Sequence, residues 1–346
     1  MRALLIGLGA LVVIAFAAWQ FVLGNAGAQD VLMARGLDAR MGQAPQAPPE
    51  GGIRVFMCGT SSPLPNPDRA QACVAVLVDD RIFVVDAGAA SAGVASTGPL
   101  ALENLRALLV THYHSDHIAD IPEFNLISWV AGRPAPLQII GPAGVETVVS
   151  GLNRTYALDN SYRVAHHGAE LLPPELGVLE ARTIEAGVII DEDGLVITAF
   201  PVNHAPISPA VGYRFDYGGR SVVVTGDTIV TDGLEAAARD ADLLLSDGLS
   251  TPIVQAMEKA ARENGQPRRA KIFFDIQDYH ASITSMVEMA ERVGVRQLAF
   301  YHLVPAPANA LLERIWRRDL PDDVMLTDDY MTFDLPAGSD AIIVED

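Results

Sequence analysis

Short apolar runs separated by turn residues alternate with longer amphipathic stretches along most of the chain. Apolar runs bounded by Gly, Pro, Asn and Asp are typical of β-strands. We predict strands over Ile53–Cys58, Cys73–Val78, Arg81–Asp86, Leu105–Thr111, Val196–Pro201, Ala210–Tyr217, Ser221–Thr225 and Gln297–Tyr301. Helical periodicity predicts helices over Glu123–Val130, Gly144–Ala157, Asp232–Ala238, Pro252–Asn264 and Ser282–Val293. Because two series of strands are each followed by helices, we expect an α/β fold with two packed sheets and helices outside.

The N-terminal end has a different pattern. Residues 3–23 are uncharged, with Gln20 as the one strongly polar side chain, and a helix of this length spans about 30 Å, the thickness of a bilayer's hydrocarbon core. The lone Arg2 favours a cytoplasmic N-terminus and an extracytoplasmic remainder. Ala26-Gly27-Ala28 has the form of a signal-peptidase site. We therefore predict a signal anchor or signal peptide over 1–28, a Pro-rich linker over 29–52 and a folded domain over 53–346.

Composition narrows the set of partners. The 43 acidic against 24 basic residues give a formal net charge of −19, which repels phosphate backbones, so no nucleic-acid partner is expected. Basic residues gather only at 268–271 and 314–318, and we interpret both groups as solvated helix faces and loop. The two cysteines, Cys58 and Cys73, lie in runs that could pair as a hairpin. A disulfide is geometrically feasible, but we expect buried free thiols.

The strongest chemical signal follows the predicted strand Leu105–Thr111. Here His112, His114, Asp116 and His117 occur within six positions. Three imidazoles and a carboxylate are costly to bury together unless each finds a polar partner. Neutral imidazole nitrogen and carboxylate oxygen are donors that zinc accepts. The pattern predicts a metal site rather than a His-rich surface loop.

Three further donors follow apolar strands later in the chain. They are His204, Asp227 and His302. Loops at strand ends are where rigid scaffolds carry functional residues. Taken alone, His204 or His302 would more often be a core or rim histidine than a ligand. Combined with the 112–117 cluster, they favour a shared site.

The order of these residues resembles the metallo-β-lactamase superfamily, whose signature is His-x-His-x-Asp-His. The resemblance extends from about residue 53 to 333 and implies a four-layer αββα sandwich, preceded here by the N-terminal hydrophobic helix. It also implies two zinc ions, for which manganese or iron could substitute. One would be held by His112, His114 and His204, and the other by Asp116, His117 and His302, with Asp227 bridging. Asp86 is either an acceptor that orients a ligand imidazole or a simple turn former.

Finer motifs resemble the ribonuclease Z-type branch, which includes arylsulfatases and other phosphodiesterases. They are Met57–Pro65, Val211–Phe215 and Thr225–Thr228. His280-Ala281-Ser282 is similar to the branch's catalytic His-Ser-Thr motif, and Asp247 stands in place of its partner glutamate. The resemblance implies catalytic roles for Asp116, His280 and Asp247, although His280 is alternatively a capped surface histidine.

These observations predict an extracytoplasmic dinuclear zinc hydrolase that cleaves phosphate or sulfate esters of small anionic molecules. Endonucleolytic processing of transfer-RNA 3′ ends is an alternative, although the 22 residues between His204 and Asp227 leave no room for the branch's RNA-clamping arm. Lactonase or β-lactamase-type hydrolysis and an inactive metal-binding module are further alternatives. Residues 3–23 would contact the membrane if uncleaved, and homodimerisation is left open.

Overall fold

A computed structural model of the chain describes residues 14–42, 44–318 and 320–345. The chain divides into two compact units, Met1–Pro45 and Gln46–Asp346. In the N-terminal unit, residues 14–24 are helical and helix α2 spans Ala26–Met41. The predicted membrane segment, residues 3–23, lies partly outside the described residues. Within the described part of the chain, none of the helices combines the length and apolar character needed to cross a bilayer.

Helix α2 occupies the first half of the segment that we expected to be an irregular linker, residues 29–52. Its sequence is rich in Ala, Leu, Met and Arg, which have high helix propensity. Asn25 caps it, because its side chain accepts a hydrogen bond of 2.9 Å from the Ala28 backbone N–H. The prolines that suggested a linker lie only after the helix ends.

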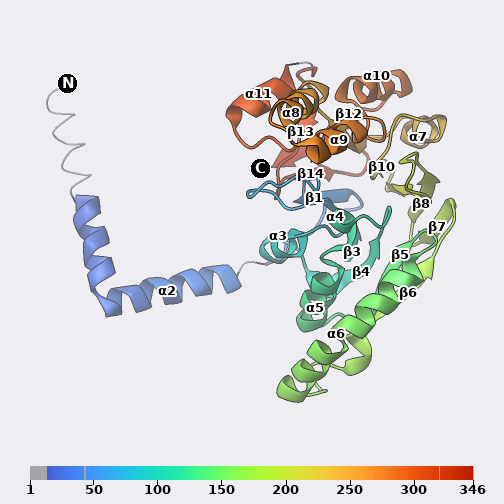
Figure 1. Cartoon of the computed structure of the whole chain (residues 1–346). Coiled ribbons are helices and arrows are strands. Elements are labelled where there is room, and N and C mark those ends of the chain that lie inside the picture. Colours follow the sequence, from blue (N-terminus) through green and yellow to red (C-terminus); the bar gives the residue numbers. More distant parts are fainter. Residues whose placement is uncertain (1–13, 43, 319, 346) are drawn as a thin grey trace. The chain divides into compact units, whose positions relative to one another are not determined.

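Two β-sheets form the centre of the second unit (Figure 1). The first sheet runs in the order β15-β14-β1-β2-β3-β4-β5-β6 and the second in the order β13-β12-β11-β10-β9-β8-β7. The strands of the first sheet are β1 (Ile53–Gly59), β2 (Cys73–Val78), β3 (Arg81–Val85), β4 (Leu105–Leu109), β5 (Leu137–Gly141), β6 (Leu179–Thr183), β14 (Thr332–Leu335) and β15 (Ile343–Glu345). Those of the second are β7 (Gly187–Glu192), β8 (Leu195–Pro201), β9 (Val211–Tyr217), β10 (Arg220–Val224), β11 (Leu243–Leu249), β12 (Gln297–Val304) and β13 (Met325–Leu326).

Helices cover the outer faces of both sheets. They are α3 (Ser91–Thr97), α4 (Ser115–Ile118), α5 (Ile121–Ala131), α6 (Val145–His167), α7 (Asp232–Ala238), α8 (Thr251–Glu263), α9 (Pro267–Asp275), α10 (Ile283–Val293) and α11 (Ala310–Arg317), with short 3₁₀ turns at Leu102–Asn104 and Pro174–Leu176. One apolar core lies between the sheets, a second packs α3, α5 and α6 against the first sheet, and a third packs α7, α10 and α11 against the second. The predicted αββα sandwich is confirmed.

Strand direction explains where a site can form. Strands β3 to β6 are parallel to one another, and so are β10 to β13. Strand β8 runs in the same direction as β10, because both are antiparallel to β9. The segments that follow β4, β8, β10 and β12 therefore leave at the carboxyl ends of their strands, where ligands collect in α/β sheets.

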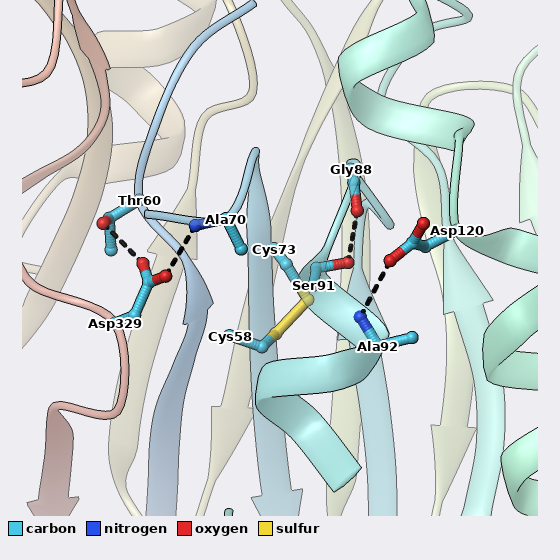
Figure 2. Close-up of a disulfide and its surroundings, with 9 residues drawn as sticks. All are labelled: Cys58, Thr60, Ala70, Cys73, Gly88, Ser91, Ala92, Asp120 and Asp329. Carbon is cyan, nitrogen blue, oxygen red and sulfur yellow. Dashed lines mark hydrogen bonds between the residues drawn. A yellow bond between two sulfur atoms is a disulfide. The ribbon is translucent and has the colours of Figure 1, made fainter. Parts of the chain in front are cut away.

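A disulfide joins Cys58 of β1 to Cys73 of β2 (Figure 2), so the prediction of free thiols is wrong. The two strands are antiparallel neighbours, and the Cα atoms lie 4.9 Å apart, within the range that a disulfide requires. Asp329 holds the loop that the disulfide closes, since Thr60 Oγ1 donates to it at 2.7 Å and the Ala70 backbone N–H at 2.6 Å. This loop is thereby fixed at the carboxyl end of the first sheet.

Candidate metal centre

The His-rich turn leaves β4 and folds into the short helix α4. His112 and His117 are fully buried, and Asp116 is nearly so. Helix α4 begins at Ser115, so Asp116 and His117 lie in its first turn and next to each other. The turn places three imidazoles within van der Waals distance, with ring centroids 4.1 Å apart for His112 and His117 and 4.7 Å apart for His112 and His114.

The second sheet brings three more donors to the same place. His204 follows β8, and Asp227 follows β10 after Gly226. Gly226 has φ of +62°, and a Cβ there would lie 2.8 Å from the Thr111 Cβ, so only glycine lets the two sheets approach at this point. His302 lies inside β12 where the β11–β12 register shifts, and its φ of 36° turns it out of the regular strand.

Asp227 lies between two groups of donors. Its Oδ2 is 3.7 Å from His204 Nε2 and 3.3 Å from His117 Nε2. Its Oδ1 is 3.4 Å from His302 Nε2. The seven expected donors form two sets whose ligand atoms lie within 4.8 Å of one another: His112, His114, His204 and Asp227, and then Asp116, His117 and His302. The structure thus brings together all seven residues that were expected to bind metal.

These residues fit two divalent cations. His114 Nδ1 lies 3.0 Å from His112 Nε2 and 3.4 Å from His204 Nε2, so three ring nitrogens converge, and a proton can be shared by only two of them. His117 Nε2 and Asp227 Oδ1 are buried and have no hydrogen-bond partner among the described residues. Orphaned buried polar atoms are rare unless a bound group satisfies them. A mixed His/Asp donor set suits zinc and also manganese or iron.

Burial and neighbouring carboxylates shift the pKa values of the ligand histidines in opposite directions. Burial lowers the pKa of His112 well below its usual value and that of His204 to about 4, so both are neutral ligands near pH 7. Burial also disfavours charge on His117, but Asp227, Asp86 and Asp116 outweigh it and raise the pKa of His117 well above its usual value. Asp227 and Asp116 likewise raise the pKa of His302 against burial. Cations would therefore displace protons from these two rings.

Asp86 fixes the orientation of His117. It is fully buried, and His117 Nδ1 donates to its Oδ2 at 2.7 Å. The backbone N–H of Thr111 donates to Oδ1 at 2.9 Å and the Thr111 hydroxyl to Oδ2 at 2.8 Å. This bonding places the ring proton on Nδ1 and leaves Nε2 free to ligate. Asp86 also has a positive φ of 60°, so the orienting and turn-forming interpretations both hold.

His280 and Asp247 lie beside the metal ligands. His280 Nδ1 is 2.9 Å from Asp247 Oδ2, and both residues are buried. A ligand atom of His280 lies within 4.8 Å of those of Asp227 and His302. Burial raises the pKa of Asp247 and the hydrogen bond to His280 opposes that rise. His280 is therefore not a surface residue, although Ser282, two residues on, does cap α10 by accepting from the Ser285 backbone N–H.

One residue near the ligands was not expected from the sequence. The backbone carbonyl of Tyr279 accepts a hydrogen bond of 3.0 Å from His204 Nδ1. Its half-buried ring lies 4.9 Å from the His204 ring and 4.8 Å from that of His280, between centroids. Every residue type offers a backbone carbonyl at this position, so sequence carries little signal for this contact.

Comparison with known proteins gives consistent similarities. A family model described as a beta-lactamase superfamily domain matches residues 81–303. Ribonuclease Z of Mycobacterium bovis is 38% identical over 263 residues, which cover 73% of this chain and 87% of that protein. Ribonuclease Z of Mycolicibacterium paratuberculosis is 34% identical over 294 residues, which cover 83% of this chain and 100% of that protein. Because 294 aligned residues include all of the latter protein, it carries no long arm that this chain lacks.

Solved structures show the same fold at lower identity. Human tRNase Z, short form, has a TM-score of 0.58 at 19% identity, and the match covers 82% of this chain and 99% of that one. The metallo-beta-lactamase fold protein YhfI of Bacillus subtilis has a TM-score of 0.57 at 18% identity, with 81% and 98% covered.

Proposed function

Since the chain belongs to the metallo-β-lactamase superfamily, with ribonuclease Z proteins among its relatives, and is a metal-dependent hydrolase, we propose that it hydrolyses phosphodiester bonds. The observation that carries the proposal is the His280–Asp247 pair, which lies against Asp227 and His302. An acid at this position suits an alkyl phosphodiester, because its leaving oxygen departs as a basic alkoxide unless it receives a proton.

The metal ligands act as a set. His112, His114 and His204 would hold one cation, Asp116, His117 and His302 the other, and Asp227 would contact both. When bound, two divalent cations lower the pKa of water and neutralise charge that builds up on a phosphoryl group. Asp86 keeps His117 in the tautomer that ligates.

His280 would supply the proton that the leaving oxygen needs. With Nδ1 bonded to Asp247, its Nε2 is the nitrogen left to contact substrate. As water adds to phosphorus and the ester P–O bond breaks, Nε2–H would give its proton to the departing oxygen. Asp247 stabilises the charged ring and keeps it oriented, which makes Asp247 a positioning residue.

Precursor transfer RNA is the first substrate to test, because the relatives at 33–38% identity carry the name ribonuclease Z. The net charge of −19 had favoured small anionic esters over RNA. The order of these two substrate classes is therefore reversed. The short connection from His204 to Asp227 does not oppose it, since the M. paratuberculosis relative aligns over its whole length without an added arm.

A small anionic ester is the second candidate, and two observations favour it. The Cys58–Cys73 disulfide is typical of oxidising compartments, and the uncharged run over 3–23 is typical of an export or anchor segment. Under this second candidate the enzyme would work outside the cytoplasm, where it would meet small esters rather than precursor transfer RNA. The location of the protein therefore bears directly on its substrate.

The test compares turnover of the full-length protein, supplied with zinc, on a precursor transfer RNA with a 3′ trailer, a bis-aryl phosphodiester, an aryl sulfate and an acyl-lactone. We expect cleavage of the phosphodiesters. His280→Ala should lower that turnover roughly 10²–10⁴-fold with unchanged metal content. The matched control is His166→Ala, which alters an exposed histidine of α6 and should have no effect. Turnover of the lactone alone would refute the proposal.

A further inference from the structure

Helix α9 presents cations and large apolar side chains together on its exposed surface. Arg268, Arg269 and Lys271 are exposed, as are Ile272 (53%) and Phe274 (56%). Arg268, Lys271 and Phe274 follow one another at intervals of three, so they form one row along the helix. The helix is anchored beside this row, since Ala270 is buried and α9 packs on α8.

Two of the cations are not neutralised locally. Neither Arg268 nor Arg269 makes an ion pair with a carboxylate among the described residues, and Arg269 only donates to the Gln266 side chain at 3.1 Å. Lys271 is paired with Asp275. In a chain with a net charge of −19, two unpaired guanidinium groups next to an exposed phenylalanine form a local exception to the acidic surface.

The position of α9 connects this surface to the site. The residue after the helix, Ile276, is buried in a cluster with Leu249 of β11, Val254 of α8 and Val304 of β12. Three residues later Tyr279 packs against His204, and His280 pairs with Asp247. Only six residues separate Phe274 from His280, which limits their Cα atoms to about 20 Å apart.

We propose that α9 binds the single-stranded part of an RNA substrate and leads it to His280, a proposal that rests on the phosphodiesterase function above. Single strands are bound by cations that contact phosphates and by aromatic rings on which bases stack. Arg268 and Arg269 would contact phosphates, and Phe274 would stack on a base. A guanidinium suits this role because its planar fork matches a phosphate.

The experiment measures binding of a short fluorescent single-stranded RNA to the full-length protein by anisotropy over a range of salt. The variant Arg268→Gln/Arg269→Gln should flatten the slope of log Kd against log salt by about 1.4 and weaken binding about 25-fold at about 0.1 M salt, since each phosphate contact contributes about 0.7 to the slope. Phe274→Ala should weaken binding about tenfold. The matched control, Arg314→Gln/Arg318→Gln, removes two exposed arginines at α11 and should bind like the wild type.

Three results would overturn the proposal: no RNA binding by the wild type, equal loss in the α9 and α11 variants, or binding of phosphatidylserine-containing vesicles through α9 with no binding of RNA. Turnover of all variants on a small bis-aryl phosphodiester, which cannot reach α9, should equal that of the wild type. Salt-dependent RNA binding through α9 without cleavage would leave this proposal standing and refute ribonuclease activity. Cleavage of RNA with no effect of the α9 variant would refute the role of α9 and leave ribonuclease activity standing.

Discussion

Replacing Asp86 with asparagine tests how the buried carboxylate controls the metal site. Asp86 accepts from three donors, the Thr111 backbone N–H, the Thr111 hydroxyl and His117 Nδ1–H. Asparagine has one acceptor oxygen, which can remain with the Thr111 backbone. Its amide group would then face His117 Nδ1 with two N–H donors. The ring must either lose this hydrogen bond or move its proton to Nε2, the nitrogen that is free to ligate.

The magnitude follows from that conflict. A hydrogen bond to a charged group contributes about 1.5–3 kcal/mol, and each 1.4 kcal/mol is a factor of about ten in an equilibrium constant. Asp86→Asn should therefore weaken binding of the cation on His117 roughly 10–100-fold, which is also the range usual for residues that orient a ligand. The cation on His112, His114 and His204 should be affected less.

The assay is competition with a chelator of known affinity, read as two successive dissociation constants for zinc. The matched control is Asp242→Asn, which changes another buried carboxylate that accepts from the Ser221 backbone N–H at 2.8 Å. Asp242 contacts none of the metal ligands through its hydrogen bonds or ion pairs in the described residues. It should lower thermal stability without changing zinc affinity. If Asp86→Asn retained both dissociation constants within threefold, the assigned tautomer of His117 would be wrong.

Three other changes have expected outcomes. Asp227→Ala should lose at least one of two zinc ions by elemental analysis, because Asp227 lies between both donor groups; two retained ions would contradict the bridging position. Metal loading should release about two protons, seen with a pH indicator, because His117 and His302 have raised pKa values without metal. Zinc affinity should thus fall as pH falls, and the metal-free protein should lose this stabilisation as pH rises through the folded pKa of these rings. Cys58→Ser/Cys73→Ser should cost about 3 kcal/mol in chemical unfolding, since the disulfide closes a loop of 15 residues; an unchanged midpoint would show that the thiols are not bonded.

The metal ligands could be identified from sequence because each follows an apolar run. A strand that ends in a polar donor delivers that donor to a sheet edge, and three such ends, at His204, Asp227 and His302, met the 112–117 turn. Their order along the chain matched a family signature. That signature assigned each donor to one of two cations, which a local pattern cannot do. The fold followed from the same runs.

Features that depend on distant partners were missed. Strand β11 was not predicted, because the polar pair Ser246-Asp247 interrupts its apolar run. The family resemblance did pair Asp247 with His280, 33 residues away, and that hydrogen bond is what makes the burial of Asp247 tolerable. Helix α6 was expected to end at Ala157 but continues to His167, because its outer half is largely exposed and has no apolar periodicity to detect. The disulfide depends on the register of β1 against β2. Helix α9 is short and mostly exposed, so its pattern resembled a solvated loop.

The most direct test of the account is a crystal structure of the zinc-loaded protein with anomalous scattering at the zinc edge. We expect two peaks, about 3.5–4 Å apart, with one bound by His112, His114 and His204 and the other by Asp116, His117 and His302. Asp227 should contact both. A single peak, or peaks held by other side chains, would contradict the dinuclear site on which the proposed hydrolysis depends.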